Sequence, residues 1–104
     1  MKVINKYECV VILNSKLEEE ATQGLIEKFK AIIETEGTID SIDEWGKRRL
    51  AYEIDDMTEG YYVLYNFASE GTLITELERV LKITDGVLRS MVIKKDEDPT
   101  IIVD

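Results

Sequence analysis

The sequence predicts an α+β fold of the ferredoxin-like, split βαβ type, in which a four-stranded antiparallel sheet carries two helices on one face. Two observations predict it. Segments rich in β-branched and aromatic residues alternate with segments whose apolar residues recur at helical spacing, in the order β-α-β-β-α-β. The length of 104 residues suits one domain with its own core. We therefore expect this domain over residues 1–95, followed by an acidic C-terminal tail over residues 96–104.

The first predicted strand covers residues 7–13, because they are rich in β-formers and are followed by Asn14 and Ser15. A helix is expected next. Residues 15–18, Ser-Lys-Leu-Glu, fit a capping box, and Gly37 ends the helix. The apolar positions of this helix recur every three or four residues and are Leu17, Ala21, Leu25, Phe29, Ile32 and Ile33.

A long second strand is predicted over residues 38–54. It contains a lone glycine, Gly46, which indicates a bulge or a turn within the strand. Residues 55–60 form a polar turn. The aromatic and β-branched residues of the segment 60–67 predict the third strand.

The second helix is expected to be capped within residues 69–72. Asp85 and Gly86 then turn the chain into the fourth strand, residues 87–94. Residues 100–103 are a short β-prone segment that could pack on a partner or be disordered. The apolar positions of the second helix are Leu73, Leu77, Val80 and Leu81.

The charge of the chain is acidic overall but unevenly distributed. The net charge is −9, while residues 1–16, 45–52 and 85–95 carry net charges of +2, +3 and +2. A protein that coats nucleic acid nonspecifically is usually basic overall. If this chain binds nucleic acid, it would therefore have to do so locally, through a patch. The densest cluster, residues 47–49, could contact phosphate or could be a solvated strand end.

The sequence offers no histidine-assisted nucleophile, no histidine metal site and no phosphate loop. There is no histidine, and none of the phosphate-loop motifs occurs among the six glycines. Cys9 is the only cysteine and lies in an apolar run, so we interpret it as a buried hydrophobe. We expect no enzyme, no cofactor, no metal and no small-molecule substrate. No segment reads as a signal peptide or a membrane span, so we expect a cytoplasmic protein.

The alternation of side chains along each strand assigns two faces to the predicted sheet. The face toward the helices carries Tyr7, Cys9, Val11, Leu13, Tyr61, Val63, Tyr65, Phe67, Leu88, Ser90 and Val92. The opposite face, called here the outer face, should be polar if it meets water. It nevertheless carries many apolar residues, which indicates that a protein partner covers it, although a homodimer or tolerated exposure would also account for them. These residues are Val10, Ile12, Tyr62, Leu64, Val87, Met91 and Ile93.

Four stretches of the sequence carry a resemblance to a known family. The most specific is Gly-Lys-Arg-Arg-Leu-Ala-Tyr-Glu-Ile at residues 46–54; the others are residues 7–8, 60–62 and 89–94. Across about residues 3–95 the chain resembles the bacterial small-subunit ribosomal protein six family. This resemblance implies a non-enzymatic component of the ribosome in the cytoplasm. It also implies binding to the central domain of small-subunit ribosomal RNA together with small-subunit ribosomal protein eighteen, whose basic surface would offset the acidity of this chain.

The resemblance and the charge pattern together give the candidate site residues. Arg48 and Arg49 match the basic pair of the family motif, while Arg89 and Lys94 match basic positions of its last strand. With neighbouring lysines, the predicted RNA-binding set is Lys2, Lys47, Arg48, Arg49, Arg89, Lys94 and Lys95. The predicted partner-binding set, taken from the outer face and the adjacent edge strand, is Val10, Ile12, Leu50, Tyr52, Ile54, Tyr62, Leu64 and Met91.

Other functions of a ferredoxin-like domain remain open at this point, because the fold hosts many of them. The main alternative is a metabolite-sensing or protein-interaction module. An RNA-recognition motif is a weaker alternative, since the third strand lacks the aromatic and basic spacing of that motif.

Overall fold

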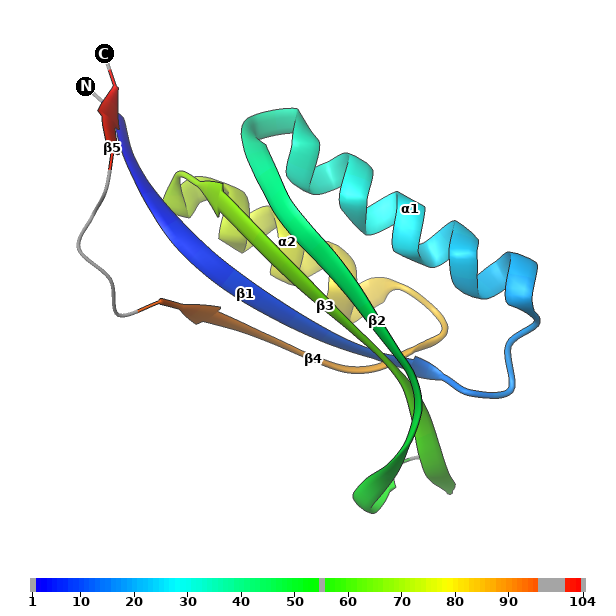
Figure 1. The fold of residues 1–104 in the computed structure, drawn as a ribbon. Coiled ribbons are helices and arrows are strands. Elements are labelled where there is room, and N and C mark those ends of the chain that lie inside the picture. Colours follow the sequence, from blue (N-terminus) through cyan, green and yellow to red (C-terminus); the bar gives the residue numbers. More distant parts are fainter. Residues whose placement is uncertain (1, 55, 96–100, 104) are drawn as a thin grey trace.

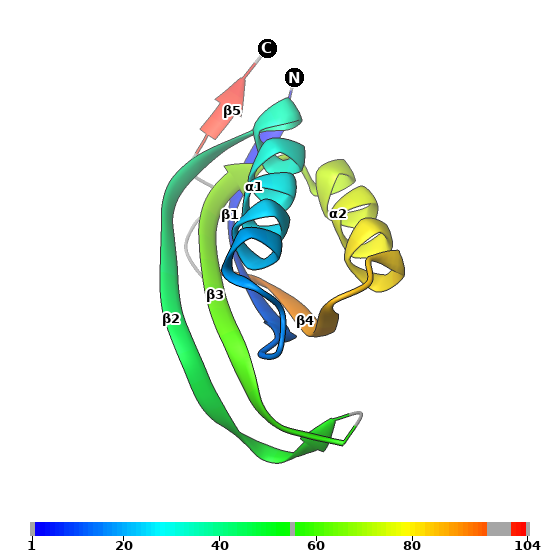
Figure 2. The ribbon, with the colours of Figure 1, turned by 90° about the vertical axis from the view of Figure 1, so that its right-hand side faces the viewer.

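The computed structural model drawn in Figure 1 describes residues 2–54, 56–95 and 101–103. Its elements follow the expected order, so the ferredoxin-like prediction is confirmed. Both helices lie on the same side of the sheet, and the other side is left open (Figures 1 and 2). The elements are β1 Lys2–Asn14, α1 Glu19–Glu36, β2 Gly37–Ile54, β3 Met57–Ser69, α2 Gly71–Ile83, β4 Val87–Lys94 and β5 Ile101–Val103.

The sheet has the strand order β2-β3-β1-β4, and all neighbouring strands are antiparallel. The short strand β5 pairs with the beginning of β1, with Ile101 opposite Ile4, and this brings the two ends of the chain together (Figure 1). The β-prone segment near the C-terminus therefore pairs within this chain. The remainder of the expected tail, residues 96–100 and 104, lies outside the described residues.

The hydrophobic core lies between the sheet and the two helices. Alternate residues of β1 and β3 point toward the helices and are buried, as the sequence predicts. Each helix contributes a stripe at three- and four-residue spacing. The residues of the core are Tyr7, Cys9, Val11, Leu13, Ile26, Phe29, Ile33, Val63, Tyr65, Phe67, Leu73, Leu77 and Leu81.

The first helix starts later than the capping-box pattern predicts. It begins at Glu19, and Glu18 is the N-cap without a side-chain cap hydrogen bond. The reason lies in the preceding turn, where the Asn14 side-chain oxygen accepts a hydrogen bond of 2.9 Å from the main-chain N–H of Lys16. Asparagine commonly closes such local turns. Ser15 is thus part of a turn and is not a helix cap.

The predicted bend of β2 at Gly46 is confirmed. Gly46 has φ = +77°, a left-handed conformation that favours glycine. The register with β3 shifts at the same place, because Glu44 lies opposite Val63 and Gly46 lies opposite Tyr62. Trp45 is therefore the extra residue of a β-bulge, and such a bulge bends its strand.

The hairpin between β2 and β3 is longer than the sequence predicts. β3 begins at Met57, so the expected polar turn of residues 55–60 is reduced to its first part, of which Asp55 lies outside the described residues. Asp56 follows with φ = 64°. Figure 2 shows that this hairpin runs past the two helices and curls at its end.

Strand β4 has the predicted bounds but a different arrangement at its start. Ile12 lies opposite Arg89, whereas Leu13 lies opposite Val87, so Leu88 is an extra residue in β4. The alternation of faces therefore shifts there, and Val87 packs against the core. The assignment of Val87 to the outer face was wrong, because alternation along the sequence cannot anticipate a bulge.

Replacing Gly60 by alanine is expected to destabilise the protein by about 1–3 kcal/mol. A Cβ atom there would overlap Cγ2 of Ile12 and would lie 3.3 Å from Cδ2 of Leu50. Gly24→Ala is the matched control, since no atom lies within 4 Å of its added Cβ and alanine favours a helix interior over glycine. Urea denaturation measures both changes. Equal stability of the two variants would contradict the close packing of Gly60.

Candidate protein and RNA interface

The outer face is built from facing residues of β3, β1 and β4. One row across these strands is Tyr62, Ile12 and Arg89, and the next is Leu64, Val10 and Met91. A third row, toward the other end of the sheet, is Asn66, Glu8 and Ile93. Neither helix covers these rows (Figure 1).

Five residues of the first two rows, together with Ser90 of β4, line an open groove of about 290 Å³. Its surface is mostly apolar, and Met91 is 52% exposed. Exposed apolar surface of this kind marks an interaction site when it is contiguous. The residues that line the groove are Val10, Ile12, Tyr62, Arg89, Ser90 and Met91.

The β2–β3 hairpin forms one end of this face. The ring of Trp45 stacks on Tyr62, with centroids 6.2 Å apart and an angle of 12° between the rings. Leu50 is only 9% exposed, because it packs beside Gly60 and Ile12. Leu50, a predicted partner residue, is thus already largely covered by residues of this chain. Trp45 was not predicted as a site residue. The sequence feature that could have drawn attention to it is the neighbouring Gly46, which indicates a bulge in the strand.

Tyr52 and Arg89 meet across this end of the outer face. The guanidinium carbon of Arg89 lies 5.9 Å from the centroid of the Tyr52 ring, and Nη1 of Arg89 donates a hydrogen bond to the Tyr52 hydroxyl. Tyr52 itself is 60% exposed. The contact joins one predicted partner residue to one predicted RNA residue. Ile54, the last residue of β2, is half-buried.

The cations of β2 do not share a single face. Arg48 lies opposite Gly60, on the outer side, while Lys47 and Arg49 lie opposite Tyr61 and Glu59 on the other side. All three are exposed. The Arg48 guanidinium donates a hydrogen bond of 3.3 Å to the Lys47 carbonyl.

The remaining predicted RNA residues are dispersed as well. Lys94 is exposed and lies opposite Tyr7, and Lys2 lies opposite Val103 at the beginning of β1. The ammonium of Lys95 is 3.8 Å from the carboxylate of Glu8. The fold therefore gathers the predicted partner residues of β1, β3 and β4 on one face but distributes the predicted RNA residues over both.

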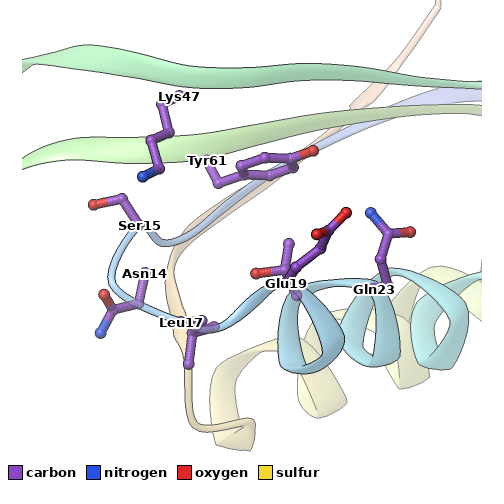
Figure 3. Close-up of a pocket in the computed structure, with 8 residues that line it drawn as sticks. Asn14, Ser15, Leu17, Glu19, Gln23, Lys47 and Tyr61 are labelled. Atoms are coloured by element: carbon purple, nitrogen blue, oxygen red, sulfur yellow. The ribbon is translucent and has the colours of Figure 1, made fainter.

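A second cavity, of about 250 Å³, lies on the helix side between the β1–α1 turn and the hairpin (Figure 3). Lys47 reaches toward Ser15 there, beside Tyr61. The Tyr61 hydroxyl and the Gln23 amide each donate a hydrogen bond of 2.9 Å to the same oxygen of Glu44. The bond to Glu44 raises the pKa of Tyr61, so the phenol stays protonated at neutral pH.

The only cysteine, Cys9, is free and buried. Burial, reinforced by the charge of Glu78, raises the pKa of Cys9 to about 12, so its thiol is not a nucleophile at neutral pH. Within residues 2–54 and 56–95, no three acidic or cysteine side chains gather in a way that could hold a metal ion. None of the described helices is both long and apolar enough to cross a membrane.

The fold and its open face define a ferredoxin-like α+β domain with an exposed apolar groove on its sheet. A sequence profile of ribosomal protein S6 matches residues 6–94. Small ribosomal subunit protein bS6 of Thermoanaerobacter pseudethanolicus is 57% identical over 95 residues, which cover 90% of this chain and all of that protein. The bS6 protein of Alkaliphilus oremlandii is 52% identical over 94 residues, with the same coverage. The chain belongs to the ribosomal protein S6 family.

A solved structure agrees with this assignment. The crystal structure of 30S ribosomal protein S6 from Thermotoga maritima superposes with a TM-score of 0.85 at 32% identity, and covers 88% of each chain. The chain is therefore a protein of the small ribosomal subunit and of the cytoplasm, from a family of structural proteins rather than enzymes. Membership of this family excludes the two alternatives, a metabolite sensor and an RNA-recognition motif. The fold alone would not exclude them, because all three classes share it.

Proposed function

We propose that this protein binds the central domain of small-subunit ribosomal RNA together with small-subunit ribosomal protein eighteen. The observation that carries the proposal is the apolar groove of the outer face, which neither of the two described helices covers. Burying a large apolar side chain contributes on the order of 1.5–3 kcal/mol. A partner that covers Tyr62, Leu64 and Met91 would bury three such side chains, which favours pairing through this face.

The charge of the chain supports an RNA-binding role that is shared with the partner. With a net charge of −9, the chain alone would be repelled by RNA at most orientations. Arg48 and Arg49 are exposed, and neither forms an ion pair with a carboxylate in the described part of the chain. They are therefore available to phosphate oxygens, while a basic partner supplies the remaining positive surface.

Replacing both Arg48 and Arg49 by alanine is expected to weaken RNA binding by the pair and to reduce the salt slope by about one for each lost phosphate contact. The fold should persist, because exposed charged residues usually change stability by about 0.5 kcal/mol or less. Filter binding with the partner present, at several salt concentrations, measures the slope.

The matched control removes the same charge from the helical layer, as Lys30→Ala with Lys82→Ala. We expect this control to leave the salt slope unchanged. An unchanged affinity and slope for the Arg48 and Arg49 variant would show that this pair does not contact RNA.

A further inference from the structure

Arg89 was predicted to contact RNA, but its surroundings belong to the outer-face groove. It shares a row of the sheet with Ile12 and Tyr62, and it is the one charged residue among the six described residues that line the groove. A partner segment seated in the groove would cover the guanidinium as well. A covered charge is costly unless it is paired and hydrogen-bonded.

The contact with Tyr52 fixes where that guanidinium lies. The ring of Tyr52 supports it by a cation–π contact, and the hydroxyl accepts one of its N–H groups. A guanidinium has five N–H donors, so four remain for other acceptors. Because Tyr52 comes from the β2–β3 hairpin and Arg89 from β4, the hairpin holds the side chain at the rim of the groove.

We propose that Arg89 is a residue of the protein-docking groove and not a phosphate contact. The partner that fits is a polypeptide segment that places an apolar side chain in the groove and an oxygen acceptor, a carboxylate or a main-chain carbonyl, against the guanidinium. Tyr52 is then a positioning residue that holds Arg89 for this acceptor. The inference rests on the proposed function, since it deepens the docking of the partner ribosomal protein on the outer face.

The test measures two equilibria separately. Titration calorimetry gives the affinity for small-subunit ribosomal protein eighteen without RNA, and filter binding at saturating partner gives the RNA affinity and salt slope of the pair. We expect Arg89→Gln to weaken partner binding tenfold or more and to leave the salt slope of the saturated pair unchanged. Arg89→Lys should also weaken partner binding, because an ammonium keeps the charge but lacks the planar fork of donors.

The Tyr52 variants test the positioning role. Tyr52→Phe keeps the ring and removes the hydroxyl, so we expect a loss of partner affinity smaller than that of Tyr52→Ala. In an Arg89→Gln background, the two Tyr52 variants should differ little, because the group that they position is gone. Lys82→Gln, in the last turn of α2, is the matched control and should leave partner binding unchanged.

Unchanged partner binding by Arg89→Gln, with a salt slope that falls by about one, would overturn the inference and identify Arg89 as a phosphate contact. Failure of the parent chain itself to bind the partner would overturn the proposed function, and this inference with it. The parent titration therefore distinguishes the two failures.

Discussion

Replacing Tyr62 and Leu64 by aspartate is expected to abolish binding of the partner ribosomal protein. Both side chains lie on the outer face, opposite Ile12 and Val10 of β1. Each contributes on the order of 1.5–3 kcal/mol if an interface buries it, and each aspartate would instead place an unpaired charge in that interface. The helix-facing core should survive, because neither residue belongs to it.

Titration calorimetry against the partner measures this loss, with circular dichroism as the folding control. Ile83→Asp is the matched control, since Ile83 is an equally apolar position at the end of α2 and is 68% exposed. Trp45 adds a second readout. It is the only tryptophan and stacks on Tyr62, so its fluorescence reports directly on the outer face. A folded double variant that binds the partner as tightly as the parent would exclude the outer face as the docking surface.

Replacing Phe67 by alanine is expected to lower the free energy of unfolding by about 3–5 kcal/mol. Phe67 is fully buried, stacks on Tyr7 with centroids 5.7 Å apart, and lies opposite Ile39 of β2. The substitution would leave a cavity between three strands and the helices.

Urea denaturation measures this loss, and Tyr62→Ala on the same strand is the comparison. Tyr62 is only half-buried, so its loss should cost clearly less. If the two variants were equally stable, the helix-facing side of β3 would not be the main core.

The order of elements and the helix-facing side of β1 and β3 were predictable from the sequence, because both depend on local alternation and spacing. Gly46 was also correctly predicted as a bend, since a lone glycine inside a strand often marks a bulge or a tight bend. The start of α1 was not predictable from the capping pattern. Asn14 competes for the local N–H groups, and which residue closes the turn depends on the end of β1.

The contacts between distant segments could not be predicted from the sequence. Tyr52 and Arg89 are 37 residues apart in the sequence, and their contact depends on how the fold places the end of β2 beside β4. Val87 likewise packs against the core and not on the outer face, because β4 contains an extra residue that only its pairing with β1 reveals. The assignment of individual cations to RNA stays a prediction, because Lys47, Arg48 and Arg49 alternate between two faces.

The central claim is that this chain binds ribosomal RNA as one half of a pair that forms through its outer face. Filter binding of a central-domain RNA fragment tests it most directly, with this chain alone, the partner alone and the two together at one salt concentration. We predict that the pair binds at least tenfold more tightly than this chain alone, because an acidic protein with dispersed cations gains most of its RNA contacts from the complex. RNA binding by this chain alone that is as tight as binding by the pair would contradict the account.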